Sequence, residues 1–107
     1  LDFKWEVEAL TNIIKNSIEH SYENGIVLIN IDSTDLYTEV ILKDFGCGID
    51  KKNIKNIFKR FYKLNDNDNG FGIGLSLAKE IVDADNGRIK VKSELGKGTS
   101  FIIRYMK

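Results

Sequence analysis

The sequence has few of the residues that cross-link chains or bind structural metals. It contains no proline, one cysteine (Cys47) and one histidine, so it can form no internal disulfide and has no Cys/His spacing typical of zinc. Sixteen basic and sixteen acidic residues leave no net charge, which argues against a nucleic-acid partner. The longest strongly apolar run, 26–29, is far too short to span a membrane, and no signal peptide precedes it. We therefore expect a cytoplasmic chain that is not inserted in a membrane.

The 107 residues fit one domain, 1–107, and apolar periodicity predicts its α+β fold class. Helical spacing predicts helices near 8–21 and 75–85 and a weaker one over 50–62. Alternation predicts a hairpin of strands 26–32 and 36–44, and then two paired strands carrying Ile89 and Val91, and Phe101 and Ile103, on one face. Strands with one solvated face predict an antiparallel sheet with helices on the other face, a two-layer α/β sandwich.

The helix over 8–21 carries two asparagines one turn apart, Asn12 and Asn16. Asparagine is a poor helix former, so two in mid-helix need a reason. An amide oxygen is a hard ligand that suits Mg²⁺ together with phosphate, whereas a plain polar helix edge is the structural alternative. The apolar residues of this helix predict its inward face: Val7, Leu10, Ile13, Ile14 and Ile18.

An acidic residue followed by glycines ends the second strand, in the segment 44–48 with the sequence DFGCG. The carboxylate of Asp44 could accept a hydrogen bond from the exocyclic amine of adenine, and the glycines would let a flat ring approach. The alternative is a simple exit from the strand into a turn. A protein-kinase interpretation of Asp-Phe-Gly fails because the chain is too short and lacks the other kinase motifs. We expect Cys47 to be a small buried filler.

A second glycine cluster, 70–74 with the sequence GFGIG, leads directly into the helix that starts near Leu75. Free N–H groups at such a helix start favour phosphate, although the cluster matches neither a Rossmann nor a Walker motif, and a hinge is the alternative. The polar run 64–69 before it predicts a mobile loop that could close over a nucleotide. Arg60 and Lys63 could then reach the phosphates, or could simply form a solvated basic edge.

In this order, the motifs resemble the ATP-binding catalytic domain of sensor histidine kinases, in the superfamily shared with gyrase, Hsp90 and MutL. NIIKNSIEHS resembles the asparagine box, DFGCGI the first glycine box and IFKRFYK the phenylalanine box. GFGIGLSLAKEIV resembles the second glycine box, and SELGKGTSF the closing glycine-threonine element. The resemblance implies a Bergerat-type fold with a mixed, mostly antiparallel sheet and a mobile ATP lid.

The resemblance also implies roles for these residues, with ATP and Mg²⁺ as cofactors. Asn12 and Asn16 would be catalytic, with Asn16 as the Mg²⁺ ligand and Asn12 beside the phosphates. Asp44 would bind the adenine amine, and Gly46, Gly48 and Thr99 would shape the base pocket. The phosphate contacts and the lid would come from Arg60, Lys63, Gly70, Gly72 and Gly74.

The implied function is transfer of the γ-phosphoryl group of ATP to a histidine on a separate helical hairpin of the parent protein, and then to a response regulator in two-component signalling. We expect the chain to be part of a longer, membrane-bound sensor kinase and to bind ATP with little turnover, because His20 is an unsuitable acceptor. Glu19 stands where many members have a basic residue. The strand that usually precedes the asparagine helix is absent, so an exposed sheet edge could pair with another copy.

Two other functions stay open at this point. An anti-sigma-factor-type serine kinase has the same nucleotide fold, but such proteins usually carry a glutamate at the position of Asn12, whose amide cannot accept a proton. A degenerate nucleotide-sensing module is the non-enzymatic alternative, and Glu19 is its strongest support.

Overall fold

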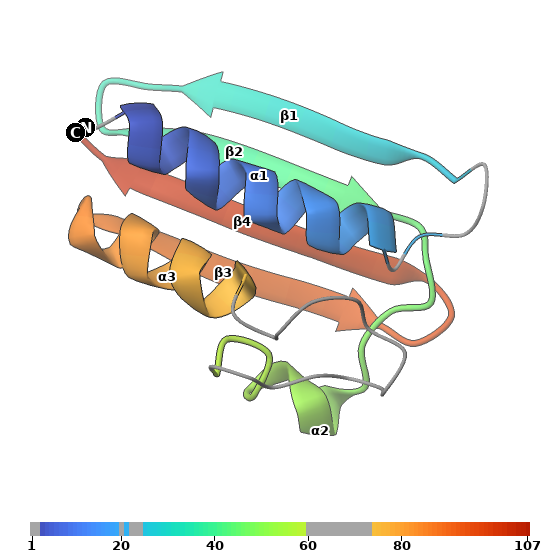
Figure 1. The fold of residues 1–107 in the computed structure, drawn as a ribbon. Helices are drawn as coiled ribbons and strands as arrows, with labels where there is room; N and C mark the ends of the chain where they lie inside the picture. The colour runs from blue at the N-terminus through green and yellow to red at the C-terminus, as the bar shows by residue number, and fades with distance from the viewer. Residues whose placement is uncertain (1–2, 20, 22–24, 60–73) are drawn as a thin grey trace.

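The structure is a computed structural model that describes residues 3–19, 21, 25–59 and 74–107. Within these residues, four strands form one sheet in the order β1-β2-β4-β3 (Figure 1). The strands are β1 (Val27–Ser33), β2 (Tyr37–Asp44), β3 (Gly87–Glu94) and β4 (Gly98–Met106). All pairings between them are antiparallel, which confirms the predicted hairpin and the predicted C-terminal pair. The described strands therefore include no parallel pair of the kind that a mixed sheet would contain.

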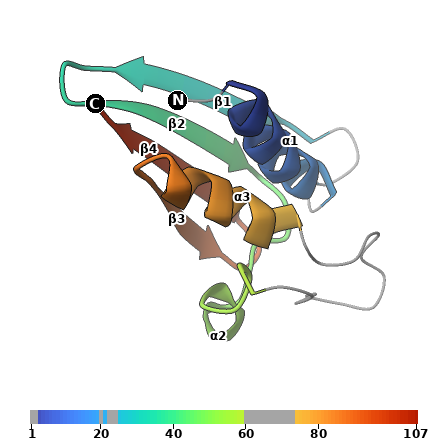
Figure 2. The same ribbon diagram turned by 60° about the vertical axis from the view of Figure 1, so that its left-hand side comes forward.

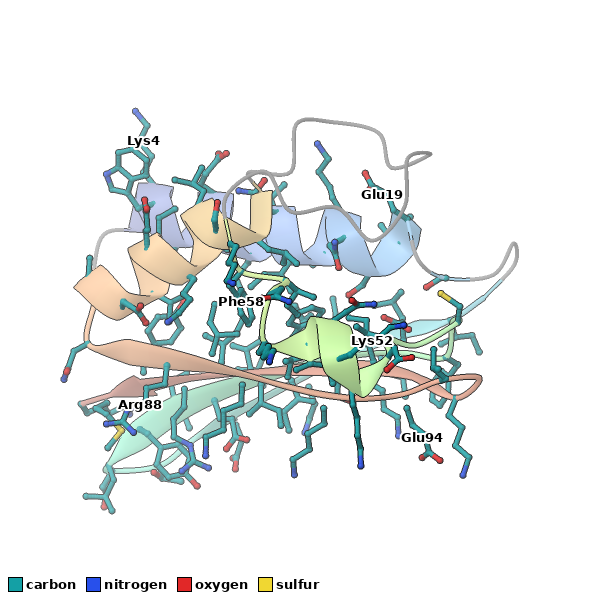
Figure 3. All side chains as sticks on the ribbon, turned by 90° about the horizontal axis from the view of Figure 1, so that it is seen from below. Lys4, Glu19, Lys52, Phe58, Arg88 and Glu94 are labelled. Carbon is teal, nitrogen blue, oxygen red and sulfur yellow. The ribbon has the colours of Figure 1, made fainter. Side chains whose placement is uncertain are left out.

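Two helices cover one face of the sheet and lie side by side (Figures 1 and 2). They are α1 (Phe3–Glu19), which packs on β2, and α3 (Gly74–Ala84), which packs on β3. The other face of the sheet carries charged side chains such as Arg88 and Glu94, which point away from the helices (Figure 3). This arrangement confirms the predicted two-layer α+β sandwich.

The short helix α2 (Lys51–Ile54) follows β2 and packs near β3. The Asp50 side chain caps it by accepting a hydrogen bond from the backbone N–H of Lys52, at 3.1 Å. Turns follow the helix up to residue 58. The helix predicted over 50–62 is therefore confirmed for its first turn only, and its last residues lie outside the described chain.

The hydrophobic core lies between the two helices and the inner face of β2, β4 and β3. Its buried apolar side chains come from α1, β2, α3 and β4 and from the segments on either side of α2, whereas β3 and α2 contribute partly buried residues. The buried ones are Ala9, Ile13, Val40, Leu42, Ile49, Ile57, Ala78, Val82, Phe101 and Ile103.

The inward face of α1 differs from the predicted one. Val7 and Ile18 are 61% and 60% exposed, so their assignment to the core was wrong. Ile13 is buried as predicted, and Leu10 and Ile14 are partly buried against the core, but the other buried positions of the helix are Glu6, Ala9 and Ser17. Helical spacing places the four buried residues on one side of α1 and the apolar residues Val7 and Ile18 on its flank. The described residues leave that flank of α1 largely exposed.

Candidate functional site

Three of the predicted motifs lie at the same end of the molecule. The C-terminal end of α1, the end of β2 and the start of α3 all lie toward this end in Figure 1. They carry Asn16, Asp44 and Gly74 respectively. The fold therefore brings the asparagine helix, the acidic strand end and the start of the glycine-led helix into one region.

Asp44 is held rigidly at the end of β2. Its side chain is 2% exposed, and its Oδ1 accepts hydrogen bonds from the backbone N–H groups of Gly46, at 3.0 Å, and Thr99, at 3.2 Å. A buried carboxylate is costly without such donors, so the two bonds offset its desolvation. Both bonds use Oδ1, and the carboxylate is consequently fixed in orientation.

Ser93 connects the strand ends around Asp44. Its hydroxyl oxygen accepts a hydrogen bond from the N–H of Ile49, at 2.7 Å, and the hydroxyl donates to the carbonyl of Gly98, at 2.9 Å. It also lies 2.8 Å from the hydroxyl of Thr99. Because a hydroxyl has only one proton, Thr99 is then the donor in that contact. Sequence reasoning missed Ser93, although a small polar residue after Ile89 and Val91 on an inward strand face was a signal.

The glycines beside Asp44 are required by the backbone. Gly48 has a φ of 76°, and a Cβ built on it would lie 2.2 Å from the carbonyl oxygen of Glu94. A Cβ on Gly98 would lie equally close, at 2.2 Å, to the carbonyl oxygen of Asp44. Gly46 is buried and donates to Asp44. These contacts show why the segment after Asp44 needs glycine, and they also identify Gly98, which was not among the predicted site residues.

Asn12 faces the start of α3. A Cβ built on Gly74 would lie 3.8–3.9 Å from three side-chain atoms of Asn12, so the two residues are neighbours. The Nδ2 of Asn12 is buried and has no hydrogen-bond partner among the described residues. A buried amide donor without an acceptor is uncommon in folded proteins. Asn16 lies one turn further along α1 and is half-buried.

Four predicted site residues, Arg60, Lys63, Gly70 and Gly72, lie outside the described residues, as do His20 and the predicted lid loop 64–69. Their roles stay predictions. Cys47 is exposed, so the expectation that it is a buried filler was wrong. The reason is local: the turn after β2 directs residue 47 outward while residues 46 and 49 are buried.

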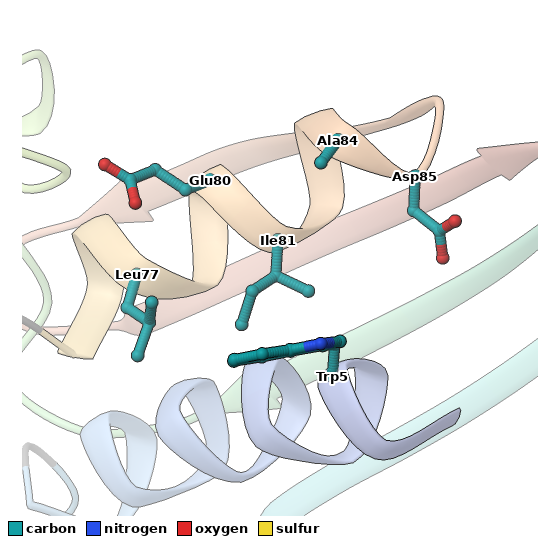
Figure 4. A pocket seen from close by; sticks show the side chains of 6 residues that line it. All are labelled: Trp5, Leu77, Glu80, Ile81, Ala84 and Asp85. Atoms are coloured by element: carbon teal, nitrogen blue, oxygen red, sulfur yellow. The ribbon is translucent and has the colours of Figure 1, made fainter. Parts of the chain in front are cut away.

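Two of the hollows that described residues line lie at opposite ends of the fold. One, of about 560 Å³, borders Asp44 and Thr99, but it also includes Lys43 and Lys92 on the outer sheet face and neither asparagine. The other, of about 330 Å³, lies between α1 and α3 at the far end (Figure 4). There the indole of Trp5 faces Leu77 and Ile81, with Glu80 and Asp85 at the edge. Neither hollow joins Asn12 to Asp44.

The described residues contain no cluster of three or more His, Cys, Asp or Glu side chains that could hold a metal ion by themselves. The donors near the start of α3 are instead amides. Amide oxygens fit a Mg²⁺ ion that takes most of its ligands from phosphate and water, so the residues present are compatible with that ion.

Comparison with known proteins agrees with the geometry. Residues 4–107 match the family described as histidine kinase-, DNA gyrase B- and HSP90-like ATPases. The sensor histidine kinase YclK of Bacillus subtilis is 38% identical over 110 residues, which cover 96% of this chain and 23% of YclK. The sensor protein SrrB of Staphylococcus aureus is 36% identical over 104 residues, which cover 94% of this chain and 18% of SrrB.

Solved structures show the same fold. The catalytic domain of the histidine kinase ThkA superimposes with a TM-score of 0.85 at 27% identity, over 99% of this chain and 69% of that one. The mycobacterial sensor histidine kinase MprB gives a TM-score of 0.87 at 24% identity, over 99% of this chain and 72% of that one. The chain belongs to the histidine kinase-, DNA gyrase B- and HSP90-like ATPase family. Within that family it corresponds to the catalytic domain of sensor histidine kinases.

The chain spans about a fifth of the length of the curated relatives that it matches. Among the helices of the described residues, none is both long enough and apolar enough to cross a lipid bilayer.

Proposed function

We propose that the chain binds ATP together with Mg²⁺ and that, as part of a longer sensor kinase, it donates the γ-phosphoryl group to a histidine on a separate helical hairpin. A response regulator would then receive the group. The observation that carries the proposal is the fixed carboxylate of Asp44. Two backbone N–H groups hold its Oδ1, which leaves Oδ2 as the acceptor for an exocyclic amine.

The phosphate end of the site would lie between Asn12, Asn16 and the start of α3. The Nδ2 of Asn12 is a buried hydrogen-bond donor without an acceptor among the described residues, and a phosphate oxygen would supply one. The N-terminus of α3 also favours negative charge. Asn16 would present an amide oxygen to the metal. A bound Mg²⁺ would neutralise charge on the phosphates, which is a large part of phosphoryl-transfer catalysis.

Asn12 has no carboxylate, so the chain offers no general base at that position. This supports transfer to a histidine acceptor over the mechanism of the anti-sigma-factor-type kinases. The residues of this chain would therefore contribute to the reaction by binding ATP, orienting its phosphates and excluding water.

Isothermal titration with ATP, with and without Mg²⁺, tests the proposal. We expect Mg²⁺ to tighten ATP binding to the wild-type chain and to have much less effect on Asn16→Ala. Thr11→Ala, an exposed change on the same helix, is the matched control and should behave like the wild type. Absence of ATP binding in both conditions would instead favour a degenerate module, and an unchanged Mg²⁺ effect in Asn16→Ala would remove the metal role from Asn16.

A further inference from the structure

The outer face of the sheet, away from the helices, carries a row of basic side chains on β3. Arg88, Lys90 and Lys92 alternate along this strand and are exposed, and Figure 3 shows Arg88 pointing away from the helices. Alternate residues of a strand lie on one face about 6.6 Å apart, so the three positive charges form a row about 13 Å long. Glu94, the next residue on this face, ends the row.

The row faces a further basic residue on the neighbouring strand. In the register of β3 and β4, Arg88 is the direct partner of Arg104, and like charges directly opposite each other destabilise a sheet. Charges on an edge strand can prevent its pairing with another chain. An acidic residue in place of Arg88 would do this equally well and would also pair with Arg104. Protection of the edge therefore does not explain why the charge at Arg88 is positive.

The acidic residues beside the row are already engaged. Glu39 forms an ion pair with Arg104, at 2.9 Å, and its side chain is only 16% exposed. Glu94 forms an ion pair with Lys97, at 3.5 Å. No residue of the row forms an ion pair within the described part of the chain. This half of the outer face consequently has an excess of positive charge, although the chain as a whole has no net charge.

The basic residues line a hollow of about 470 Å³ on the outer face. Ile102 and Met106 contribute apolar surface to it, and Ile102 is the direct cross-strand partner of Lys90. Apolar surface beside the charges keeps water away from one side of a bound anion, which strengthens its attraction to them. We call this site, with the row on β3 and Arg104 as its basic residues, the basic hollow. None of Asn12, Asn16 and Asp44 lines it.

The extent of the positive charge favours a short acidic peptide over a larger polyanion. Three acidic residues, Asp32, Glu39 and Glu94, lie on the same sheet face, so a flat anionic bilayer would meet them as well as the basic hollow. A nucleic-acid strand would extend past the end of the row to Glu94. An extended segment of about five residues matches the row, because its alternate side chains repeat at the same spacing. So short a segment forms no stable helix in water.

We propose that the basic hollow binds a short acidic segment of a partner protein, in an extended conformation, with carboxylates at alternate positions over Arg88, Lys90 and Lys92. The guanidinium of Arg88 can bind a carboxylate through two parallel hydrogen bonds, and the two lysines act as point charges. Because the site is exposed, these contacts weaken as salt is added. The proposal is independent of nucleotide binding.

NMR titration of the isotope-labelled 107-residue chain with two blocked peptides of identical composition tests the spacing. The peptide ETETE has carboxylates at alternate positions, whereas TEEET has them at consecutive ones. We expect ETETE to bind more tightly than TEEET, to shift resonances of β3 and β4, and to bind less tightly as salt is added. Absence of ETETE binding, or equal affinity for the two peptides, would overturn the proposal.

Arg88→Glu separates binding from stability. It would place an acid opposite Arg104, so we expect a higher free energy of unfolding in urea together with a loss of ETETE affinity of about tenfold or more. Lys55→Glu makes the same charge change at an exposed residue outside the hollow and should bind ETETE like the wild type. An Arg88→Glu chain that still binds ETETE, or that is no more stable than the wild type, would overturn the proposal. An equal loss in Lys55→Glu would reduce the effect to net charge and would overturn it as well.

Other anions and the longer protein supply the remaining tests. Phosphatidylserine vesicles and a single-stranded oligonucleotide should bind the chain less tightly than ETETE does. If either bound more tightly, and Arg88→Glu abolished that binding, the ligand would be a lipid surface or a nucleic acid and the proposal would be wrong. The longer protein should bind ETETE as the 107-residue chain does. Failure to bind there would show that a segment of its own chain occupies the basic hollow, and would also overturn the proposal.

Discussion

The carboxylate of Asp44, the proposed acceptor for the adenine amine, has a fixed orientation in the structure without a ligand. Two backbone donors fix its plane, so no side-chain freedom remains to be lost when a base approaches. Thr99, itself fixed by Ser93, supplies one of those donors. A ligand amine would consequently meet an acceptor whose position is set by three strand ends.

Replacing Asp44 by Asn tests the role of this acceptor. Asparagine can retain an oxygen toward the two backbone N–H groups, but it then turns an NH₂ group toward the amine of adenine. We expect ATP binding to weaken by about 1–3 kcal/mol, as for a lost buried hydrogen bond to a charged group, and binding of inorganic triphosphate to stay nearly unchanged. Calorimetric titration measures both, with the exposed Asp35→Asn as control. Equal weakening of the two ligands would contradict the assigned role.

Glu6 is a buried acid that the proposed ATP site does not use. It is 6% exposed, and neither of its carboxylate oxygens nor the hydroxyl of Tyr105 has a hydrogen-bond partner of acceptable geometry among the described residues. Burial raises the pKa of Glu6 above its ordinary value of 4.5, and the charge of Asp85 raises it further, while the nearby Tyr105 hydroxyl opposes the shift in part. Burial likewise raises the pKa of Tyr105.

This shift predicts a pH dependence of stability. A carboxyl with a raised pKa in the folded state binds its proton more tightly there than in the unfolded chain, so its contribution is fully present below pH 4.5 and is lost as the pH rises through the raised pKa. Glu6→Gln cannot lose a proton. We expect urea denaturation to show the free energy of unfolding of Glu6→Gln gaining on that of the wild type as the pH rises above 4.5. The exposed Glu8→Gln is the control, and a difference that does not change with pH would contradict the prediction.

At the scale of secondary-structure elements, period-2 and period-3.6 patterns were sufficient to predict the sheet, its hairpin and the two main helices. They could not predict the buried side of α1, because the apolar Val7, Ile14 and Ile18 form their own stripe at helical spacing. The side that is buried carries two polar residues, Glu6 and Ser17, beside Ala9 and Ile13.

Sequence reasoning selected candidate site residues where a single residue type carries the signal, and it did not select residues that distant contacts bring together. Asp44 and the asparagines could be selected from the sequence alone. The bond from Thr99 to Asp44 joins residues 55 positions apart, and that from Ile49 to Ser93 joins residues 44 apart. Contacts between residues so far apart leave no local pattern in the sequence. The structural roles of Ser93 and Gly98 could therefore be recognised only in the folded chain.

The turn after β2 depends on Gly48, and the chain provides its own control for this claim. Gly48 and Gly96 have similar φ angles, 76° and 80°, but a Cβ on Gly96 would meet nothing within 4 Å. An alanine in the left-handed region costs about 1–2 kcal/mol. We expect Gly96→Ala to cost that much and Gly48→Ala clearly more, because its Cβ would also collide with the carbonyl oxygen of Glu94. Chemical denaturation measures both, and equal losses would show that the collision is relieved without cost.

At the scale of the whole molecule, the proposed nucleotide site and the Trp5 hollow lie at different ends of the fold. The ends of α1 and β2 and the start of α3 gather at one end, and the Trp5 hollow lies at the other. A nucleotide bound as proposed, between the asparagines of α1 and Asp44, would occupy the first end and leave the Trp5 hollow accessible.

The last prediction concerns phosphoryl transfer by the chain as a whole. A domain that holds ATP and Mg²⁺ supplies positioning and charge neutralisation, but transfer also needs an acceptor aligned with the γ-phosphate. The only histidine of the sequence, His20, follows directly on α1, the helix that carries the proposed metal ligand. We therefore expect the chain incubated with γ-labelled ATP and Mg²⁺ to acquire almost no label, and a phosphoacceptor hairpin of the longer protein added in trans to become labelled. His20→Ala should leave that transfer unchanged. Strong labelling of the chain alone that His20→Ala abolishes would show that the acceptor lies within these 107 residues.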